Sequence, residues 1–381
     1  MPLPDHVALV LQGGGALGSF QAGVYEALAE QGVGIDWVAG ISIGAINAAI
    51  IAGNPPEDRC AKLTQFWELA SGNLPAFWLP DSDELRELAH LSAAAAVTAM
   101  GVPGFFKPHF IPPMFAPEGS QSALSFYDSG PLVETLDSLV DWKLLNDGPV
   151  RVSIGAVDIE SGNFEYFDNR SASERTGRRT RIDARHIMAS GALPPGLPPV
   201  QIGGRHYWDG GLVSNTPLSH VLDHQRGDLL VFQVDLFPAR GPMPRTITDV
   251  WSRMKDVQYS SRTRQVTDNY LKLRREHRHI DALLKKLPPE LWDDADAKAL
   301  RDMLDDGAVN IVHLIYRNRA WESGARDFEF SANTMLDHWA QGQEAVADVM
   351  CRGDLIARNI VDGKSATFDL ETPDYMKEKE A

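Results

Sequence analysis

A serine stands between two glycines at residues 40–44, in the order Gly-Ile-Ser-Ile-Gly. A short apolar stretch precedes this motif and a helical pattern rich in small residues follows it, so the serine lies on a predicted strand-to-helix turn. Gly40 and Gly44 leave room there for a sharply bent backbone, and the Ser42 hydroxyl projects at the helix N-terminus. This pattern predicts that Ser42 is a nucleophile.

A second group of glycines lies near the N-terminus, in the run Gly-Gly-Gly-Ala-Leu-Gly at 13–18. Its spacing also fits a dinucleotide-binding turn, but the acid near the required distance, Asp36, begins the second predicted strand instead of ending it. A phosphate-binding P-loop is disfavoured because its lysine is missing. We therefore expect the backbone N–H groups of Gly13, Gly14 and Gly15 to hold the oxyanion that forms when the serine attacks an ester carbonyl.

A serine nucleophile needs a base. Asp209 is the best-placed candidate, because it ends a predicted short strand and precedes Gly210 and Gly211, which allow close approach to another loop. An ordinary Asp-Gly turn is the structural alternative for this motif. His206 is the alternative base, although alternation along the strand places it on the same face as Trp208.

These residues need a scaffold that brings distant segments together. Apolar runs and helical patterns alternate along the first 70 residues as strand, helix, strand and helix, which favours a parallel sheet between helices. Further strands are expected at 150–159, 163–168 and 228–237, and further helices at 83–100 and 181–192. We predict an α/β fold of three layers, α/β/α, around a central and mainly parallel sheet.

The chain after residue 245 has a different character. A long helical stretch of mixed charge is expected at 246–286, then a strand at 310–317 and a helix at 331–350. Residues 253–286 carry ten Lys and Arg against four Asp and Glu, so this part is locally basic. We divide the chain into a catalytic domain at 1–245, a mostly helical C-terminal extension at 246–360, and a polar, frayed tail at 361–381.

The three glycine-containing motifs, in this order, resemble those of the patatin-like phospholipase family, in a bacterial type with a C-terminal extension. The segment at 189–211, in which Ala-Ser and several prolines lead to Asp-Gly-Gly, is also similar to that family, and the resemblance covers residues 5–240. It implies a serine acyl hydrolase of lipid esters that uses a serine–aspartate dyad without a histidine. No metal or cofactor is implied.

Carried over motif by motif, the resemblance implies that Ser42 is the nucleophile, Asp209 the general base, and the first three loop glycines the oxyanion hole. The glycines expected to support this site are Gly18, Gly40, Gly44, Gly210 and Gly211. The chain departs from the family at two positions. Leu17 stands where many members have Arg or Lys, and Gln12 stands where plant members have Asp, so a preference for phosphate headgroups does not carry over from the motif.

Composition narrows the class of protein. The net charge of −16 argues against a nucleic-acid partner. Two cysteines, Cys60 and Cys351, give no disulfide framework and favour a reducing, cytoplasmic setting. The N-terminus lacks the basic region of a secretion signal. Residues 37–56 are uncharged, but their glycines, asparagines and prolines favour a buried strand–turn–helix over a membrane span.

Two other functions fit parts of the sequence. One is a short-chain esterase or acyltransferase on the same fold. The other is a non-catalytic scaffold that binds lipid or a partner through its second half, with peripheral contact to an anionic membrane. The Pro- and Phe-dense stretch at 101–119 is either an ordered loop with buried aromatic residues or an apolar entrance around Phe105, Phe106 and Phe110. The cations expected to meet an anionic surface are Arg262, Arg264, Lys272, Arg274, Arg275, Arg278, Lys285 and Lys286.

Overall fold

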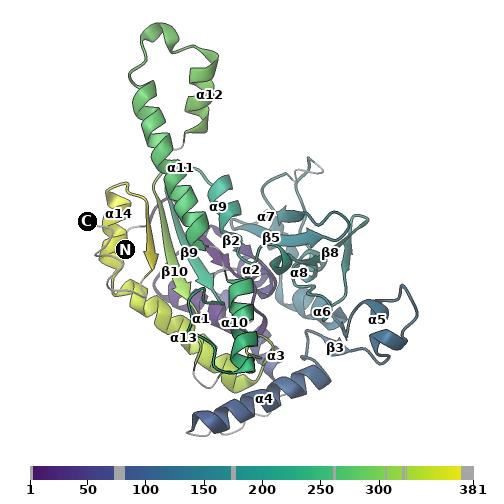
Figure 1. Cartoon of the computed structure of the whole chain (residues 1–381). Coiled ribbons are helices and arrows are strands. Elements are labelled where there is room, and N and C mark those ends of the chain that lie inside the picture. The colour runs from purple at the N-terminus through teal and green to yellow at the C-terminus, as the bar shows by residue number, and fades with distance from the viewer. Residues whose placement is uncertain are drawn as a thin grey trace.

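A nine-stranded sheet forms the centre of the molecule. The computed structural model describes residues 3–72, 82–172, 177–260, 263–304, 307–319, 322 and 324–369. In these residues the strand order is β11-β10-β9-β1-β2-β5-β8-β7, with β6 paired to β5 (Figure 1). The strands are β1 His6–Leu11, β2 Trp37–Gly40, β5 Arg151–Asp158, β6 Phe164–Asp168, β7 Val200–Ile202, β8 Arg205–Asp209, β9 Leu229–Asp235, β10 Val309–Ile315 and β11 Ala366–Asp369; β3 Lys107–Pro108 and β4 Tyr127–Asp128 form a separate pair.

The six strands from β11 to β5 are mutually parallel, whereas β6, β7 and β8 are added antiparallel beyond β5. The parallel strands are buried on both faces, which explains their continuous apolar runs. The mainly parallel α/β fold is therefore confirmed. Because β8 runs against β5, the C-terminal end of β8 lies beside the middle of β5, where Asp209 is opposite Ala156.

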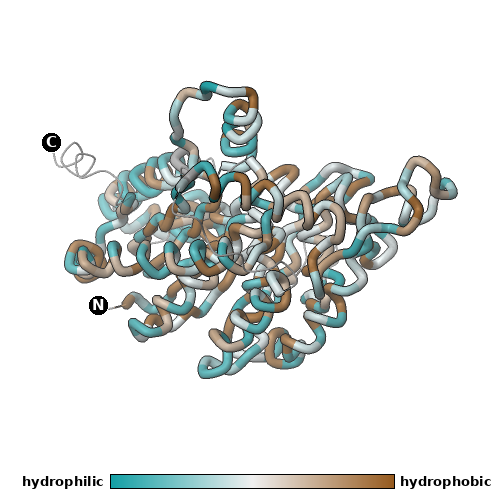
Figure 2. Tube along the Cα trace, turned by 90° about the horizontal axis from the view of Figure 1, so that it is seen from below, coloured by the Kyte–Doolittle hydropathy of each residue, from teal (hydrophilic) through white to brown (hydrophobic). Residues whose placement is uncertain are grey.

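Helices cover both faces of the sheet. Alternating β1 residues separate two cores: Leu9 and Leu11 pack toward α1, α2 and α13, and Ala8 and Val10 pack toward α9. Figure 2 shows brown and teal residues alternating along the outer helices, as expected of helices that bury one side. The helices are α1 Gly18–Glu30, α2 Ile43–Ala52, α3 Arg59–Ser71, α4 Asp83–Met100, α5 Gln121–Leu124, α6 Gly130–Leu139, α7 Trp142–Asp147, α8 Ala184–Ser190, α9 Leu218–His224, α10 Ile247–Tyr259, α11 Thr263–Leu284, α12 Ala295–Met303, α13 Ala332–Met350 and α14 Gly353–Val361.

The C-terminal part differs from the expectation in two ways. The helical stretch predicted at 246–286 is two helices, because α10 ends at Tyr259 and the backbone of the next residue, Ser260, is not helical (φ −56°, ψ 138°). α11 then leads into an arm that projects with α12 from the body (Figure 1). The expected frayed tail is wrong at residues 366–369, which form β11 and pair with β10; residues 370–381 lie outside the described part of the chain.

The uncharged segment at 37–56 forms β2, the turn and α2, as predicted, and is almost completely buried. In the part of the chain that the structure describes, no helix combines the length and apolar character needed to cross a bilayer.

Candidate active site

Ser42 occupies a strained turn between β2 and α2. Its backbone has φ 55° and ψ −122°, and it is the single non-glycine residue with positive φ among those described. A Cβ added to Gly40 would lie 2.3 Å from the Gly44 carbonyl oxygen, and one added to Gly44 would lie 2.4 Å from the Leu11 carbonyl oxygen. Neither position accommodates a side chain, so both glycines are required for this turn.

Ser190, at the end of α8, holds the Ser42 backbone in place. Its Oγ accepts a hydrogen bond from the Ser42 amide at 2.9 Å and donates one to the Gly155 carbonyl at 2.6 Å. Ser190 is fully buried, so these contacts are shielded from water. We did not assign this residue a role from the sequence, although it lies in the Ala-Ser segment that resembles the family. Only the fold shows that it meets the serine.

Asp209 lies at the end of β8, with its carboxylate beside the Ser42 side chain. The Gly211 amide donates a hydrogen bond to it at 2.7 Å, and the Ser42 hydroxyl is a second donor that lies near enough to favour its charged form. Burial raises the pKa of Asp209 to about 6, against these two donors, which lower it. In the described residues no Lys or Arg pairs with Asp209, so its charge is stabilised mainly by these two donors.

The glycine loop lies directly against Ser42, since a Cβ added to Gly13 would be 3.1 Å from the Ser42 Cβ. The Gly13 amide already donates to the Asn215 carbonyl at 3.2 Å, which corrects the expectation that it faces an oxyanion. The amides of Gly14 and Gly15 have no acceptor among the described residues. They remain the candidate oxyanion donors from this loop.

The other motif glycines also lie where backbones approach closely. A Cβ on Gly18 would be 2.4 Å from Ile43, and one on Gly210 would be 2.7 Å from the Gly155 carbonyl oxygen. At Gly211, a Cβ would lie 2.8 Å from the Asn215 side-chain oxygen. These glycines allow the three motifs to come together.

Two residues with side-chain amides, which we did not predict as site residues, join the glycine loop to the end of α10. The fully buried Gln12 donates to the Tyr259 carbonyl at 3.0 Å and accepts from the amides of Leu236 and Phe237. Asn215 donates to the carbonyls of both Gly13 and Tyr259, each at 3.0 Å. The position of Gln12 directly before the glycines was a sequence signal for its role. No sequence signal indicated Asn215, because its partners are distant in the chain.

His206 lies away from the dyad. Its Nδ1 is 2.7 Å from the carboxylate of Glu160, and its side chain is partly exposed. Alternation along β8 directs Asp209 and the buried Tyr207 to the opposite face from His206. The structure therefore does not bring this histidine to Ser42.

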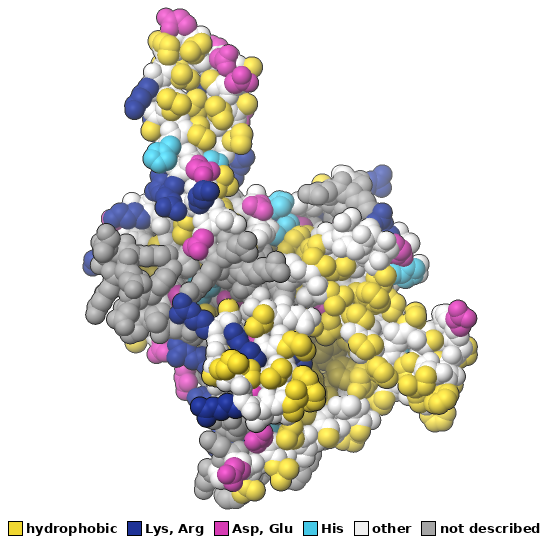
Figure 3. All heavy atoms as spheres, viewed as in Figure 1, with side chains coloured by type: hydrophobic (Ala, Val, Ile, Leu, Met, Phe, Trp, Pro, Cys, Tyr) yellow, Lys and Arg dark blue, Asp and Glu magenta, His cyan; other side chains and the backbone are white. Residues whose placement is uncertain are grey.

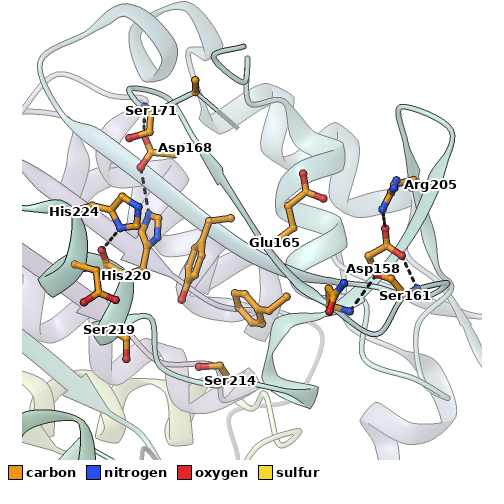
Figure 4. A pocket seen from close by; sticks show the side chains of 15 residues that line it. Asp158, Ser161, Glu165, Asp168, Ser171, Arg205, Ser214, Ser219, His220 and His224 are labelled. Atoms are coloured by element: carbon orange, nitrogen blue, oxygen red, sulfur yellow. Dashed lines mark hydrogen bonds and ion pairs between the residues drawn. The ribbon is translucent and has the colours of Figure 1, made fainter. Parts of the chain in front are cut away.

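A separate cavity of about 780 Å³ lies between β6, β8 and α9. Figure 4 shows Asp168 in its wall, with the Ser171 backbone and His220 beside it. Although burial alone would raise it, the pKa of Asp168 is held well below its usual range by the His220 ring at 3.5 Å, by hydrogen bonds from Ser153 and the Ser171 amide, and by the Arg151 charge. Across the described residues, no group of three or more His, Cys, Asp or Glu side chains is arranged to hold a metal ion.

Comparisons with known proteins place these motifs in context. A family model described as patatin-like phospholipase matches residues 9–222, and a second, described as patatin phospholipase, matches residues 257–359. The chain is 56% identical over 46 residues to lysophospholipase nte1 of Aspergillus terreus and 54% identical over 48 residues to patatin-like phospholipase domain-containing protein 7 of Mus musculus. These matches cover 12% and 13% of this chain, and 3% and 4% of the relatives.

Two solved structures are similar over much of the chain. VipD from Legionella pneumophila aligns with a TM-score of 0.37 and 15% identity, covering 95% of this chain and 78% of that one. ExoU from Pseudomonas aeruginosa aligns with a TM-score of 0.26 and 15% identity, covering 79% of this chain and 62% of that one.

Proposed function

Because the chain belongs to the patatin-like phospholipase family, we propose that it is a serine acyl hydrolase that cleaves lipid esters. Ser42 is the nucleophile, Asp209 is the general base, and the amides of Gly14 and Gly15 hold the oxyanion. The observation that carries this proposal is the buried Asp209 carboxylate, with a raised pKa, next to a serine that is held on a strained turn against the glycine loop.

The environment of Asp209 suits a base. An exposed aspartate, with an ordinary pKa of about 3.9, accepts a serine proton poorly. Burial raises the pKa of Asp209 to about 6, which brings it closer to neutral pH while leaving the carboxylate mostly ionised at pH 7. A cation beside it would reverse this effect. Asp209 therefore needs no histidine between itself and Ser42.

Acylation follows from this geometry. Asp209 accepts the proton of the Ser42 hydroxyl while Oγ attacks the ester carbonyl carbon, and the resulting oxyanion lies against the loop amides. When the intermediate collapses, the bond to the alcohol oxygen breaks and Asp209 returns its proton to the leaving alcohol. The acyl group remains on Ser42.

Deacylation uses the same groups. Asp209 accepts a proton from water, whose oxygen attacks the acyl carbonyl, and the oxyanion forms again at the loop. Collapse breaks the bond to Ser42, which recovers the proton from Asp209, and releases the fatty acid. If an alcohol takes the place of water, the same sequence is an acyl transfer.

The test compares the wild-type chain with Ser42→Ala and Asp209→Asn on p-nitrophenyl esters, phospholipids and neutral glycerides. We expect both variants to lose hydrolysis while retaining the circular dichroism spectrum and the melting behaviour of a folded protein. His206→Ala is the matched control, and it should retain the wild-type rate because His206 pairs with Glu160 outside the site. Full activity in Ser42→Ala, or inactivity of the wild-type chain on every ester, would contradict the proposal.

A further inference from the structure

We propose that the exposed apolar face of α10 docks on a lipid bilayer with anionic headgroups and sets the mouth of the active site against the membrane. This inference rests on the proposed function, which requires a lipid substrate. We call the surface the α10 face, and its members are Ile247, Val250, Trp251, Met254 and Val257.

The α10 face is a continuous apolar stripe without a partner in the described structure. Its members recur at intervals of three and four residues, which places them on one side of the helix. The opposite side is held to the protein, where the buried Asp256 pairs with the buried Arg326. The apolar side is thus the one turned outward. Figure 3 shows hydrophobic side chains gathered over α10, with Lys and Arg side chains beside them.

A second apolar region projects on the same face of the molecule, over β3 and α5 (Figure 3). The aromatic stretch at 101–119 is an ordered loop that buries some of its aromatic residues, while its place at an entrance to the site stays a prediction. Phe105 is buried and packs against Phe66 and Phe330, whereas Phe110 is fully exposed. The exposed apolar residues of this projection are Phe110, Ile111, Met114, Phe115, Leu124 and Phe126.

Both regions are joined to the segments that form the active site. The last residue of α10, Tyr259, accepts hydrogen bonds through its carbonyl from Gln12 and Asn215, which flank and hold the glycine loop. On the other side, the Phe126 amide donates to the carbonyl of Pro195 at 3.0 Å, in the segment between α8 and β7. Each of the two apolar regions is therefore attached to a segment that leads to the active site.

The charge beside the α10 face favours an anionic lipid surface. In a chain of net charge −16, residues 239–258 carry four cations. Arg253 pairs with Asp256 and Lys255 with Asp327, so Arg240 and Arg245 are the two that can meet lipid headgroups. The acids of this segment are Asp256, which is buried, and Asp249, whose carboxylate is bonded to the amides at the start of the helix. A cationic rim around an apolar stripe that contains a tryptophan is the composition expected at a membrane interface.

The basic stretch expected to meet the membrane is less suited to that task. On α11, Lys272 pairs with Glu276 and Arg274 is buried, and just after its end Lys285 pairs with Asp281. The arm that α11 forms with α12 also projects away from the body that holds the site (Figure 1). We therefore assign bilayer contact to α10.

The test measures vesicle binding without turnover, in the Ser42→Ala chain. Flotation with phosphatidylcholine vesicles is compared with flotation after one third of the lipid is replaced by phosphatidylglycerol. We expect binding to the anionic vesicles, and the added substitutions Trp251→Ser and Met254→Ser should lower the partition coefficient at least about tenfold, because interfacial binding scales with buried apolar area. Arg240→Gln with Arg245→Gln should lower it by about fivefold per cation on anionic vesicles alone.

The matched control carries Trp292→Ser and Met303→Ser on the projecting arm. Trp292 and Met303 are 54% and 61% exposed, against 57% for both Trp251 and Met254, so the same apolar area is removed elsewhere. This control should bind vesicles like its parent. Equal binding by the α10 variant and its parent would overturn the proposal. So would a concentration-dependent dimer, measured by sedimentation velocity, that the α10 substitutions abolish, because the face would then belong to a second copy.

Hydrolysis of a soluble p-nitrophenyl ester separates this proposal from the proposed function. In a chain that retains Ser42, the α10 substitutions should leave this rate unchanged and lower hydrolysis of vesicle lipid. A chain that binds vesicles through α10 but cleaves no ester would contradict the hydrolase and leave the docking face intact.

Discussion

Two buried aspartates of this molecule are held in opposite states. Asp168 is surrounded by donors, including the Arg151 guanidinium at 2.9 Å and the Ser153 hydroxyl at 2.6 Å, and its pKa lies well below the usual range. Asp209 is buried to a similar extent but accepts a hydrogen bond from one amide, with the Ser42 hydroxyl nearby, and its pKa is raised to about 6. Burial alone therefore does not make an aspartate a base. Burial raises the pKa of Asp209 because, among the described residues, no cation beside it offsets the effect.

The largest expected effect is on catalysis. Asp209→Asn removes the acceptor for the Ser42 proton, so kcat should fall by about 10²–10⁴-fold, the usual contribution of general-base catalysis. Asp168→Asn should leave kcat per folded molecule unchanged, because Asp168 lies in the wall of the separate cavity. Steady-state kinetics on one soluble ester, normalised to the folded fraction, checks both variants. An equal loss of kcat in both variants would contradict the assignment of Asp209, and not Asp168, as the base.

The free energy of unfolding should fall in Asp168→Asn but not in Asp209→Asn, the reverse of the expected effects on kcat. Asp168→Asn leaves the Arg151 guanidinium without its charged partner, and breaking such a buried pair costs about 3 kcal/mol of unfolding free energy. Urea unfolding at pH 7 measures this loss. Because the folded pKa of Asp168 is lowered, its contribution to stability is present above the unfolded pKa of about 4 and disappears as the pH falls below it. A variant as stable as the wild-type chain at pH 7 would contradict this assignment.

Asp209→Asn should stabilise the fold at pH 7. Since the folded pKa of Asp209 is raised to about 6, wild-type stability falls as the pH rises from about 4 through 6. The gain from the substitution should reach about 3 kcal/mol at pH 7 and vanish near pH 4, because a shift of one pKa unit corresponds to about 1.4 kcal/mol. Urea titrations at both pH values check the sign. A loss of stability at pH 7 would show that burial of the charge is not costly.

The smallest effect concerns the turn that holds the nucleophile. Ser190→Ala leaves the buried Ser42 amide without its acceptor, at a cost of about 1–3 kcal/mol. We expect kcat to fall about tenfold with little change in KM, because Ser190 positions the nucleophile and does not contact substrate. Ser190→Thr, which keeps the hydroxyl, should recover part of the rate. An unchanged kcat in Ser190→Ala would show that the strained turn holds without this bond.

Local sequence signals predicted the parts of the site that depend on local geometry. Gly40 and Gly44 are set by the bend around Ser42, and apolar runs that alternate with helical patterns predicted the mainly parallel sheet, although not its strand order. The place of Asp209 beside Ser42 was expected from a family resemblance, because nothing local indicates which distant serine a turn aspartate meets.

Long-range partners account for what sequence reasoning missed. The Gly13 amide is not free for an oxyanion because it donates a hydrogen bond to the Asn215 carbonyl, about 200 positions away in the chain. The break between α10 and α11 follows Tyr259, whose carbonyl accepts hydrogen bonds from Gln12 and Asn215. The helical sequence pattern continues on both sides of this break, so the sequence did not indicate it. The short strand at 366–369 has a polar sequence neighbourhood, and it forms because β10 offers a free edge.

The most direct test of the central claim is the rate at which a fluorophosphonate labels Ser42 as a function of pH. This reaction reports activation of the nucleophile without substrate binding to a membrane or product release. The account predicts a labelling rate that rises through a midpoint near pH 6 in the wild-type chain and loses both its magnitude and this midpoint in Asp209→Asn. Labelling that is equally fast and equally dependent on pH in Asp209→Asn would contradict it.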